Sequence, residues 1–466
     1  MNSRIFMSLT VLAALLAGCQ TLGPDYTRPE AKLPDAFRDA GGTEARAPVE
    51  REWWKLFRDP VLDDLIAQAI GQNLDLQAAV ARVEEAEAVV REAGAALTPS
   101  VDMGAGASRL RSSTKTGMPM PQYRTTHSLG LSTAFELDFW GRLRRAKEAA
   151  RALALASHHA RDTVELSLAG MVANSYLAMR ALDAELAVSQ ESLDNREASR
   201  KIVQSRVHAG LSSPLDLHQA EGALAATRAQ IVSLRQQRAM TEHLLALLAG
   251  NPELRIAPGD LRALPLPPVP PAGLPSSLLE ARPDLRQAEE QLVASNARIG
   301  VAKAAMYPTI SLTGALGMES KDLSDLFSSG ARTWNLGAGL ILPIFDAGAN
   351  VARVDQATAR QKQALAAWQK AVQTAFMEVN DALVALRETA EGEAAQAARV
   401  AAAEKTQALS RDRYEAGYSG YLEVLDAQRT ANDARLAAIA TRQARLAAAV
   451  DLFKALGGGW KESTAN

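Results

Sequence analysis

The chain has 466 residues, which is long enough for two or three domains or for one elongated body. Its formal net charge is −2 and its pI is about 6.4, so nothing in the composition favours a nucleic-acid partner. Long tracts rich in Ala, Leu, Gln, Glu and Arg, together with only 5% aromatic residues, indicate a mainly helical protein.

The first residues, 1–18, have the pattern of an export signal. Arg4 supplies a positive charge before an apolar run over 5–17, and small residues follow. The run is too short to cross a bilayer as a permanent helix. We therefore expect a signal peptide that is removed from the mature protein.

Cys19 follows this run directly and is the only cysteine in the chain, which excludes internal disulfides. The sequence Leu-Ala-Gly-Cys resembles the bacterial lipoprotein signal, in which the chain is cleaved before the cysteine and that cysteine is acylated. By resemblance to lipoprotein sorting, Gln20 favours delivery to the outer membrane. We therefore expect a covalent lipid on Cys19, which binds membrane lipid by burying methylene groups. A buried structural thiol is the alternative.

The chain contains an internal tandem repeat. A shift of 207 residues aligns "HAGLSSPLDLHQAEGAL" from His208 with "EAGYSGYLEVLDAQRTA" from Glu415 without a gap. The same shift, or one of 209, aligns two further pairs of segments: 129–141 with 336–348 and 95–106 with 304–315. We therefore expect two copies of one unit, at 61–250 and 284–457.

Between the two copies lies a proline-rich segment, 251–283. It holds nine of the twenty prolines. Proline interrupts helices because it lacks an N–H and its ring clashes with the preceding turn. We expect a linker or a small irregular subdomain there.

Within each copy the pattern predicts a helix, a strand, a loop, a second strand, a very long helix, a turn and a last helix. Residues 140–209 and 347–416 are each 70 residues without proline, and one continuous helix of that length would extend about 105 Å. Such lengths indicate a coiled-coil-like body. Gly210 and Gly417 suit the position just after the end of a helix.

Four segments alternate apolar and polar residues, as strands with one apolar face do: about 101–110, 128–139, 309–318 and 333–345. A soluble sheet with one buried face would show the same alternation. However, four strands in two separated hairpins have no other sheet to pack against, and about ten residues match a tilted membrane strand. Because lipid tolerates no open sheet edge, we expect several chains to pool their strands.

Taken in order, these features resemble the TolC/OprM-like outer-membrane channels, and specifically the NodT-type lipoproteins that serve tripartite RND efflux systems. The resemblance runs from Cys19 to about Gly459. Each motif alone is weak, but their order, spacing and duplication are specific. The motifs are "LGPDYTRPE" (22–30), "WWKLFRDPVLDDLI" (53–66), "FELDFWGRLRRA" (135–146), "ARPDLRQAE" (281–289), "AAMYPTISLTG" (304–314), "LPIFDAGA" (342–349) and "YLEVLDAQR" (421–429).

The resemblance implies a mainly α fold with transmembrane β-strands, built as a homotrimer. Three copies that give four strands each would close a twelve-stranded outer-membrane β-barrel, continuous with a long periplasmic coiled-coil tunnel of α-helices. An equatorial α/β belt would surround the tunnel. The chain would then divide into a signal peptide (1–18), an anchor and equatorial segment (19–60), a first efflux repeat (61–250), an equatorial inter-repeat segment (251–283), a second repeat (284–457) and a tail (458–466).

The resemblance also places a closed aperture where the helix–turn–helix tips converge. Family residues there match Tyr414 before the turn, Glu423 and Asp426 in the following helix, and Asp216 in the first repeat. Glu423 and Asp426 are three residues apart and face the same way on a helix, so threefold symmetry would stack them into acidic rings. Because like charges repel, we expect a hydrogen bond from Tyr414 to Asp216 to hold the closed state. Solvated carboxylates on an exposed hairpin are the alternative.

The turn departs from some relatives, because Ser419 stands where they carry a constricting arginine. The sequence leaves open whether Arg413 or another basic group replaces it.

By the same resemblance, a periplasmic adaptor (membrane fusion) protein docks at the helix tips. It would contact Gly210, Leu211, Gly417 and Tyr418, in grooves near 205–220 and 412–427.

No catalytic pattern accompanies these features. The sequence has no nucleophile elbow, phosphate-binding loop, zinc-ligand pair or spaced carboxylate dyad, so we expect neither an enzyme nor a metal site, and no cofactor besides the lipid. The expected function is a passive duct that carries drugs or other toxic small molecules from an inner-membrane RND-type pump across the periplasm and outer membrane. A structural coiled-coil lipoprotein and a lipoprotein enzyme are the alternatives.

Overall fold

The structure, a computed structural model, describes residues 21–31, 33–38, 50–113, 115, 122–268 and 275–459. The expected signal peptide and the expected lipidation residue, Cys19, lie outside the described residues. Much of the loop after the first strand, the middle of the proline-rich segment and the tail after Gly459 also lie outside them.

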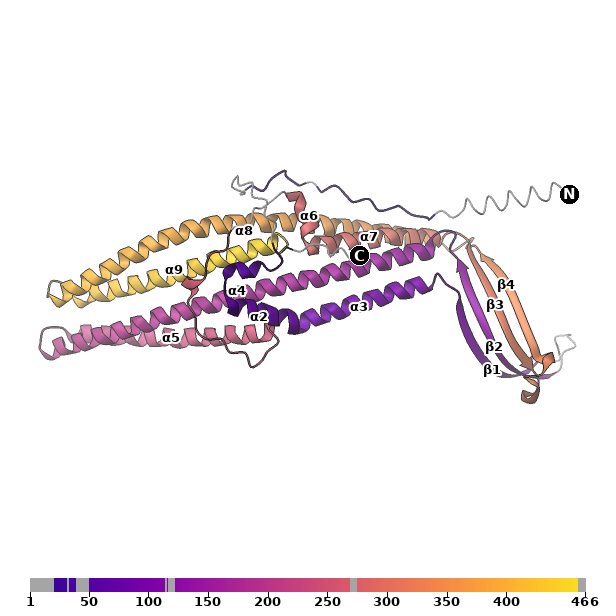
Figure 1. The fold of residues 1–466 in the computed structure, drawn as a ribbon, viewed down its shortest axis with the longest axis horizontal. Helices are drawn as coiled ribbons and strands as arrows, with labels where there is room; N and C mark the ends of the chain where they lie inside the picture. The colour runs from indigo at the N-terminus through magenta and orange to yellow at the C-terminus, as the bar shows by residue number, and fades with distance from the viewer. Residues whose placement is uncertain are drawn as a thin grey trace. The chain divides into compact units, whose positions relative to one another are not determined.

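The elements follow the expected order in both repeats (Figure 1). They are η1 (Trp53–Phe57), α2 (Pro60–Gln72), α3 (Leu74–Ala95), β1 (Ser100–Arg111), β2 (Tyr123–Leu137), α4 (Arg142–His208), α5 (Pro214–Leu248), η2 (Leu261–Ala263), η3 (Pro275–Ser277), α6 (Leu278–Ala281), α7 (Pro283–Ala304), β3 (Thr309–Ser320), η4 (Leu323–Asp325), η5 (Ser329–Ala331), β4 (Arg332–Ile341), α8 (Ala349–Glu415) and α9 (Tyr421–Ala455).

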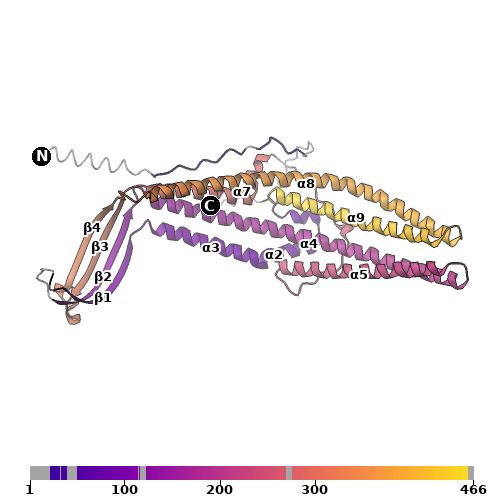
Figure 2. The same cartoon turned by 180° about the vertical axis from the view of Figure 1, so that it is seen from behind.

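The long helices of the two repeats are equal in length. α4 and α8 each have 67 residues, and α5 and α9 each have 35. Each long helix begins beside an aspartate: Asp138 accepts hydrogen bonds from the N–H groups of Leu143 and Arg144, and Asp346 accepts from Gly348 and Asn350. At the usual rise each long helix extends about 100 Å. Figure 2 shows α4 with α5 and α8 with α9 as two antiparallel hairpins.

The four strands form one antiparallel sheet in the order β1–β2–β3–β4. The expectation of two separated hairpins was wrong, because β2 and β3 pair from His127 with Ser320 to Leu137 with Ile310. β4 also ends at Ile341, earlier than the expected residue 345, and Pro343 follows, which has no N–H to donate to a neighbouring strand.

The register places most of the large apolar residues of the four strands on one face of the sheet. Met103 pairs with Leu131, which pairs with Leu316, which pairs with Trp334. Since directly paired residues point to the same side of a sheet, these four apolar side chains lie next to one another on one face. The next row, Gly104, Gly130, Gly317 and Thr333, points to the opposite face and is small. The alternation predicted from the sequence therefore gives one apolar and one small, polar face.

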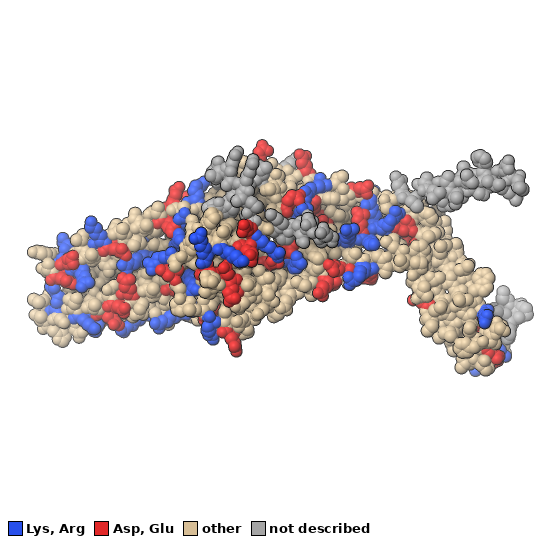
Figure 3. Space-filling model, in the orientation of Figure 1, with Lys and Arg blue, Asp and Glu red and all other residues tan. Residues whose placement is uncertain are grey.

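The apolar face is uncovered in the single chain. Trp334 is 76% exposed and Leu336 is 80% exposed. β1 and β4 each have one partner strand among the described residues, so both edges of the sheet present free backbone groups. In Figure 3 the strands carry few charged side chains, whereas acidic and basic side chains alternate over the helices. None of the described helices has an apolar stretch long enough to cross a membrane.

Contacts divide the chain into two compact units. One comprises residues 1–30, 82–158 and 287–369 and includes the sheet; the other comprises 31–81, 159–286 and 370–466 and includes the helix tips.

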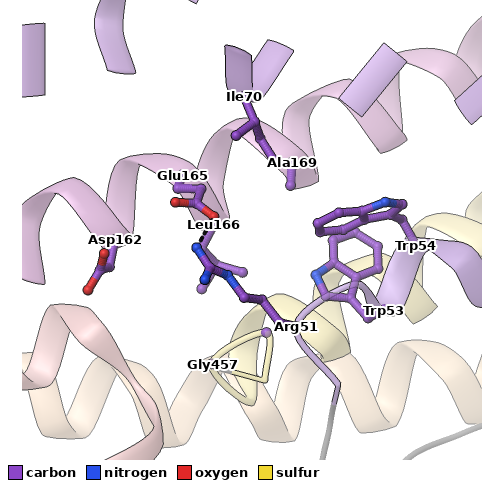
Figure 4. Close-up of a pocket in the computed structure, with 10 residues that line it drawn as sticks. Arg51, Trp53, Trp54, Ile70, Asp162, Glu165, Leu166, Ala169 and Gly457 are labelled. Atoms are coloured by element: carbon purple, nitrogen blue, oxygen red, sulfur yellow. Dashed lines mark hydrogen bonds and ion pairs between the residues drawn. The ribbon is translucent and has the colours of Figure 1, made fainter. Parts of the chain in front are cut away.

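The second unit holds a hydrophobic core in which Trp53 is fully buried and stacks on Phe453 with the ring centroids 5.5 Å apart. Figure 4 shows a small cavity beside Trp53. Arg51 and Glu165 also line this cavity and form an ion pair with a distance of 2.6 Å between their charged atoms.

A buried charge network fixes the inter-repeat segment onto α4. The carboxylate of Asp183 accepts hydrogen bonds from Arg180 at 3.1 Å, from Arg238 at 2.6 Å and from the backbone N–H of Gly259 at 3.0 Å. Arg180 also donates to the carbonyl of Ala257 at 2.7 Å. Buried charges are stable only when paired in this way, so the network determines where this segment lies.

Candidate functional site: the paired helix tips

The two long helices end in the same kind of turn. Gly210 and Gly417 have φ angles of +72° and +83°, a left-handed conformation that glycine adopts without steric cost. In the second repeat, the N–H of Gly417 donates to the carbonyl of Tyr414 at 3.0 Å and that of Tyr418 donates to Arg413 at 2.8 Å. The first repeat has the same two bonds 207 residues earlier. This Schellman motif terminates the helix and reverses the chain.

The helix that follows the first turn is capped by its own side chains. The N–H of Leu215 donates to the hydroxyl of Ser213 at 3.2 Å, and the N–H of Ser213 donates to the carboxylate of Asp216 at 3.3 Å. This reciprocal pair is a capping box. α9 begins instead at Gly420, which has no side chain for such a bond.

Tyr414 lies between the two hairpins and is 6% exposed. Its hydroxyl lies 3.4 Å from the hydroxyl of Ser212, on the turn of the first repeat. The expected hydrogen bond from Tyr414 to Asp216 was therefore wrong within this chain. Asp216 is the third residue of α5 and accepts a hydrogen bond from the N–H of Ser213, the residue that caps this helix. Because the two residues are only three apart, this local bond forms with little loss of chain entropy.

Arg206 of α4 contacts Tyr414 in two ways. Its guanidinium carbon lies 4.8 Å from the centre of the tyrosine ring, and its Nη1 donates to the backbone carbonyl of Tyr414 at 3.2 Å. The other side of the ring meets Tyr421 edge-on, with the centroids 5.6 Å apart. Arg206 and Tyr421 were not among the residues predicted from the sequence.

A small hydrophobic cluster surrounds this contact and includes residues of both hairpins. Val203 and Ala220 belong to the first hairpin, and Tyr414, Tyr421 and Val424 belong to the second. Burial raises the pKa of Tyr421 by disfavouring its phenolate; the charge of Arg196 opposes this increase, and Tyr414 and Asp216 add to it. Tyr421 is therefore neutral and acts by packing.

The two predicted acidic residues, Glu423 and Asp426, are exposed and each pairs with an arginine. Arg413 lies 3.3 Å from Glu423, and Arg429 lies 2.7 Å from Asp426. These surface ion pairs contribute about 1 kcal/mol or less each. Of the basic groups that Ser419 left open as replacements, Arg413 lies next to Glu423 and Arg429 lies next to Asp426.

Exposed apolar side chains surround both turns. Leu211 is 69% exposed and Tyr418 is 80% exposed, and these two residues occupy equivalent positions in the two repeats. Leu215 and Leu422, also equivalent and also exposed, were not predicted. Such apolar groups in contact with water are typical of a surface that binds a partner.

The comparison of the repeats singles out the two tyrosines, although not Arg206, because Arg206 aligns with another arginine, Arg413. Shifted by 207 residues, Tyr414 aligns with Val207 and Tyr421 with Pro214. The aromatic pair therefore exists in one repeat only. These two tyrosines have no equivalent pair in the first repeat, so they pack against different residues, and the tip of the first hairpin is the nearest surface that provides them.

A four-stranded sheet with one uncovered apolar face, and helices of 67 residues that end in packed tips, define the class of TolC-like outer-membrane channels. The family model described as "Outer membrane efflux protein" matches residues 65–251 and 274–458. The chain belongs to this family.

Known members resemble the chain over nearly their whole length. Cation efflux system protein CusC of Escherichia coli O6:H1 is 35% identical over 463 residues, which cover 97% of this chain and 98% of that protein. Pyoverdine export outer membrane protein OpmQ of Pseudomonas aeruginosa is 37% identical over 461 residues, which cover 96% of this chain and 97% of OpmQ. The solved outer-membrane channel OprN superposes with a TM-score of 0.87 at 31% identity, covering 95% of this chain and 100% of OprN.

The protein is therefore the outer-membrane component of an efflux system of a Gram-negative bacterium. These relatives are efflux and export components, not enzymes. In the part of the chain that the structure describes, no group of three or more His, Cys, Asp or Glu side chains is placed to hold a metal ion.

Proposed function

We propose that the protein is a passive duct, in which three copies form a water-filled channel through the outer membrane that continues as a helical tunnel into the periplasm. The sheet carries this proposal. Its apolar face is uncovered, and β1 and β4 each lack a second partner among the described residues. Lipid tolerates no open edge, so β1 of one copy pairs with β4 of the next. Three copies then close twelve strands, with the apolar face toward lipid and the small face toward water.

The duct needs partners because it has no energy source of its own. An inner-membrane RND-type pump supplies the energy, and a periplasmic adaptor (membrane fusion) protein connects the pump to the duct. The adaptor docks at the helix tips, at Gly210, Leu211, Gly417 and Tyr418. The exposure of Leu211 and Tyr418 supports this assignment.

A lipid on Cys19 anchors each copy to the outer membrane. The support is the sequence: an apolar run that ends in Leu-Ala-Gly-Cys, with no other cysteine in the chain. A lipid chain adds membrane affinity through its buried methylene groups. The inserted strands provide the rest of the attachment.

The pump, not the duct, selects the cargo. CusC is named for cation efflux and OpmQ for pyoverdine export, although their identities to this chain, 35% and 37%, are nearly equal. Since similar ducts accompany different cargoes, we assign to this one a range of small molecules, such as drugs and other toxic compounds.

The aperture lies at the helix tips and involves Asp216, Tyr414, Glu423 and Asp426. Tyr414 packs the two hairpins together, and Asp216 fixes the start of α5. Glu423 and Asp426 form rings of carboxylates around the threefold axis, and such rings favour cations. Arg413 and Arg429 partly neutralise them.

Channel recordings test this function. The purified protein should be a trimer that opens discrete channels in planar bilayers. The double variant Glu423→Gln/Asp426→Asn should lower the cation-to-anion permeability ratio by about two- to fivefold, since an exposed unit charge changes the nearby energy of an ion by about 1 kcal/mol or less. The reversal potential in a salt gradient measures this ratio.

The control is Glu388→Gln, an exposed carboxylate of α8 away from the tips, which should leave the ratio unchanged. A stably folded monomer that never conducts would contradict the duct and would leave the structural coiled-coil lipoprotein as the function.

A further inference from the structure

Arg206 and Arg413 occupy equivalent positions in the two repeats but make different contacts. They are 207 residues apart, and the backbone carbonyl of each accepts the hydrogen bond that closes its turn. The side chain of Arg413 is 58% exposed and pairs with Glu423 on its own hairpin. The side chain of Arg206 is partly buried and reaches across to Tyr414 on the other hairpin.

Three physical effects stabilise the contact of Arg206 with Tyr414. The guanidinium lies 4.8 Å from the ring centre, where a cation is attracted by the π electrons. It donates a hydrogen bond of 3.2 Å to the carbonyl of Tyr414. That carbonyl lies in the last turn of α8, the end of a helix that attracts positive charge.

The contact links the tips of the two hairpins. Tyr414 is held on one side by Arg206 and on another by Tyr421, and its hydroxyl lies next to Ser212. The equivalent position in the first repeat is Val207, which offers no ring to a cation. Arg413 therefore has no corresponding tyrosine, and the arrangement occurs once in each chain.

We propose that Arg206 is a positioning residue that keeps the aperture closed by holding Tyr414, and with it the tip of the α8–α9 hairpin, against the α4–α5 hairpin. This inference rests on the proposed duct with its aperture at the tips. Opening the aperture separates the tips of the two hairpins, and the contact of Arg206 with Tyr414 must break for that to happen. Loss of the contact therefore shifts the equilibrium toward the open state.

The test compares Arg206→Gln with Arg413→Gln, each in the full-length trimer in planar bilayers. Arg206→Gln should raise the ratio of open to closed time by about ten- to a hundredfold, because a partly desolvated cation–π contact and a charged hydrogen bond are lost together. The increase should persist in 1 M KCl, where surface charges are screened. Arg413→Gln should change open time little in 1 M KCl and should instead raise cation selectivity at low salt.

Two further variants separate positioning from overall stability. Arg206→Lys keeps the charge but loses the planar stacking group, so its open ratio should lie between those of the wild type and Arg206→Gln. Tyr414→Leu should open the channel as Arg206→Gln does, and combining the two should give less than the product of their separate effects, because they remove the same contact. The melting temperature of the trimer should stay near that of the wild type in each.

The outcomes are distinguishable. If the wild type itself never conducts, the proposed duct fails. If the wild type conducts but Arg206→Gln keeps the wild-type open ratio, or if its effect multiplies independently with that of Tyr414→Leu, the role of Arg206 is wrong. Should Arg206→Gln fail to assemble, Arg206→Lys and Tyr414→Leu decide: an unchanged open ratio in both contradicts the role.

Discussion

At the scale of single residues, Glu393 shows how the α8–α9 hairpin is held together. This residue of α8 accepts hydrogen bonds from Arg442 at 3.1 Å and from Arg445, both on α9. Arg442 also donates to the carbonyl of Leu264 at 2.8 Å, which ties the inter-repeat segment to the same place. Burial alone would raise the pKa of Glu393, but the bond from Arg445 and the charges of both arginines lower it below its usual value.

This lowered pKa predicts how stability depends on pH. A carboxyl whose pKa is lower in the folded state stabilises the fold fully above its unfolded pKa of about 4.3, and this contribution is lost as the pH falls through the folded value. Glu393→Gln should therefore lower the melting temperature by about 2 °C at pH 7 and by less at about pH 3, where part of this contribution is lost. Circular dichroism measures both. Glu388→Gln is the control and should match at both values; an equal deficit of Glu393→Gln at both would contradict the assignment.

The partner of Tyr414 is a contact that the sequence could not predict. Tyr414 was identified through the family resemblance, but its partner was assigned as Asp216, whereas the structure places Ser212 and Arg206 beside it. Asp216 has a local partner in Ser213, three residues away, and local bonds of this kind compete with longer-range ones. Arg206 and Tyr414 are 208 residues apart. No local pattern links them, because their contact depends on how two separate hairpins pack.

At the scale of elements, the periodicity of apolar residues and the positions of proline and glycine predicted most of the helices and strands. The absence of proline from 140–209 and 347–416 indicated the two long helices, and their ends, His208 and Glu415, lie two residues before the predicted glycines, Gly210 and Gly417. The alternation of strands predicted which residues share a face. It could not predict that β2 pairs with β3, because a strand edge carries no signal of its neighbour when α4, α5, the inter-repeat segment and α7 lie between the two strands.

The β2–β3 pairing depends on two glycines that face each other on the small side of the sheet. A Cβ added at Gly317 would lie 2.8 Å from the carbonyl oxygen of Leu129 and 3.0 Å from the Cα of Gly130, both of them backbone atoms that cannot move aside. Gly104 lies in the same row on β1 but has nothing within 4 Å of the corresponding position. The backbones of β2 and β3 therefore approach closely at Gly317, whereas a side chain at Gly104 would have free space.

We expect Gly317→Ala to prevent correct strand pairing and to reduce the yield of heat-resistant trimer severely, while Gly104→Ala assembles as the wild type does. The physical reason is that contacts under 3.0 Å force the backbone of β2 and β3 apart. Unheated gel electrophoresis of outer-membrane extracts measures the trimer. Equal yields from the two variants would show that the close approach of the strands is not needed for assembly.

At the scale of the whole molecule, the sheet is the reason why we propose that several copies of the chain assemble. Its apolar side chains share one face, as the register of Met103, Leu131, Leu316 and Trp334 shows, and nothing in the described chain covers them. In water such a face would cause aggregation. In lipid the face is stable but the two free edges are not. The proposed closed barrel of several copies resolves both problems, and in it membrane insertion and assembly would depend on each other.

Two neighbouring residues of β4 distinguish the proposed barrel from a soluble sheet. Leu336 lies on the apolar face, and Asn335 lies on the opposite, small face. In the barrel an arginine at Leu336 faces lipid, where it costs about 2–4 kcal/mol near the bilayer midplane, whereas an arginine at Asn335 faces the water-filled interior. Leu336→Arg should therefore deplete the trimer from the outer membrane, and Asn335→Arg should not. In a soluble sheet both positions would face water, since Leu336 is 80% exposed in the single chain, and both arginines would be tolerated alike. The amount of each variant recovered as trimer in outer-membrane fractions decides between the two.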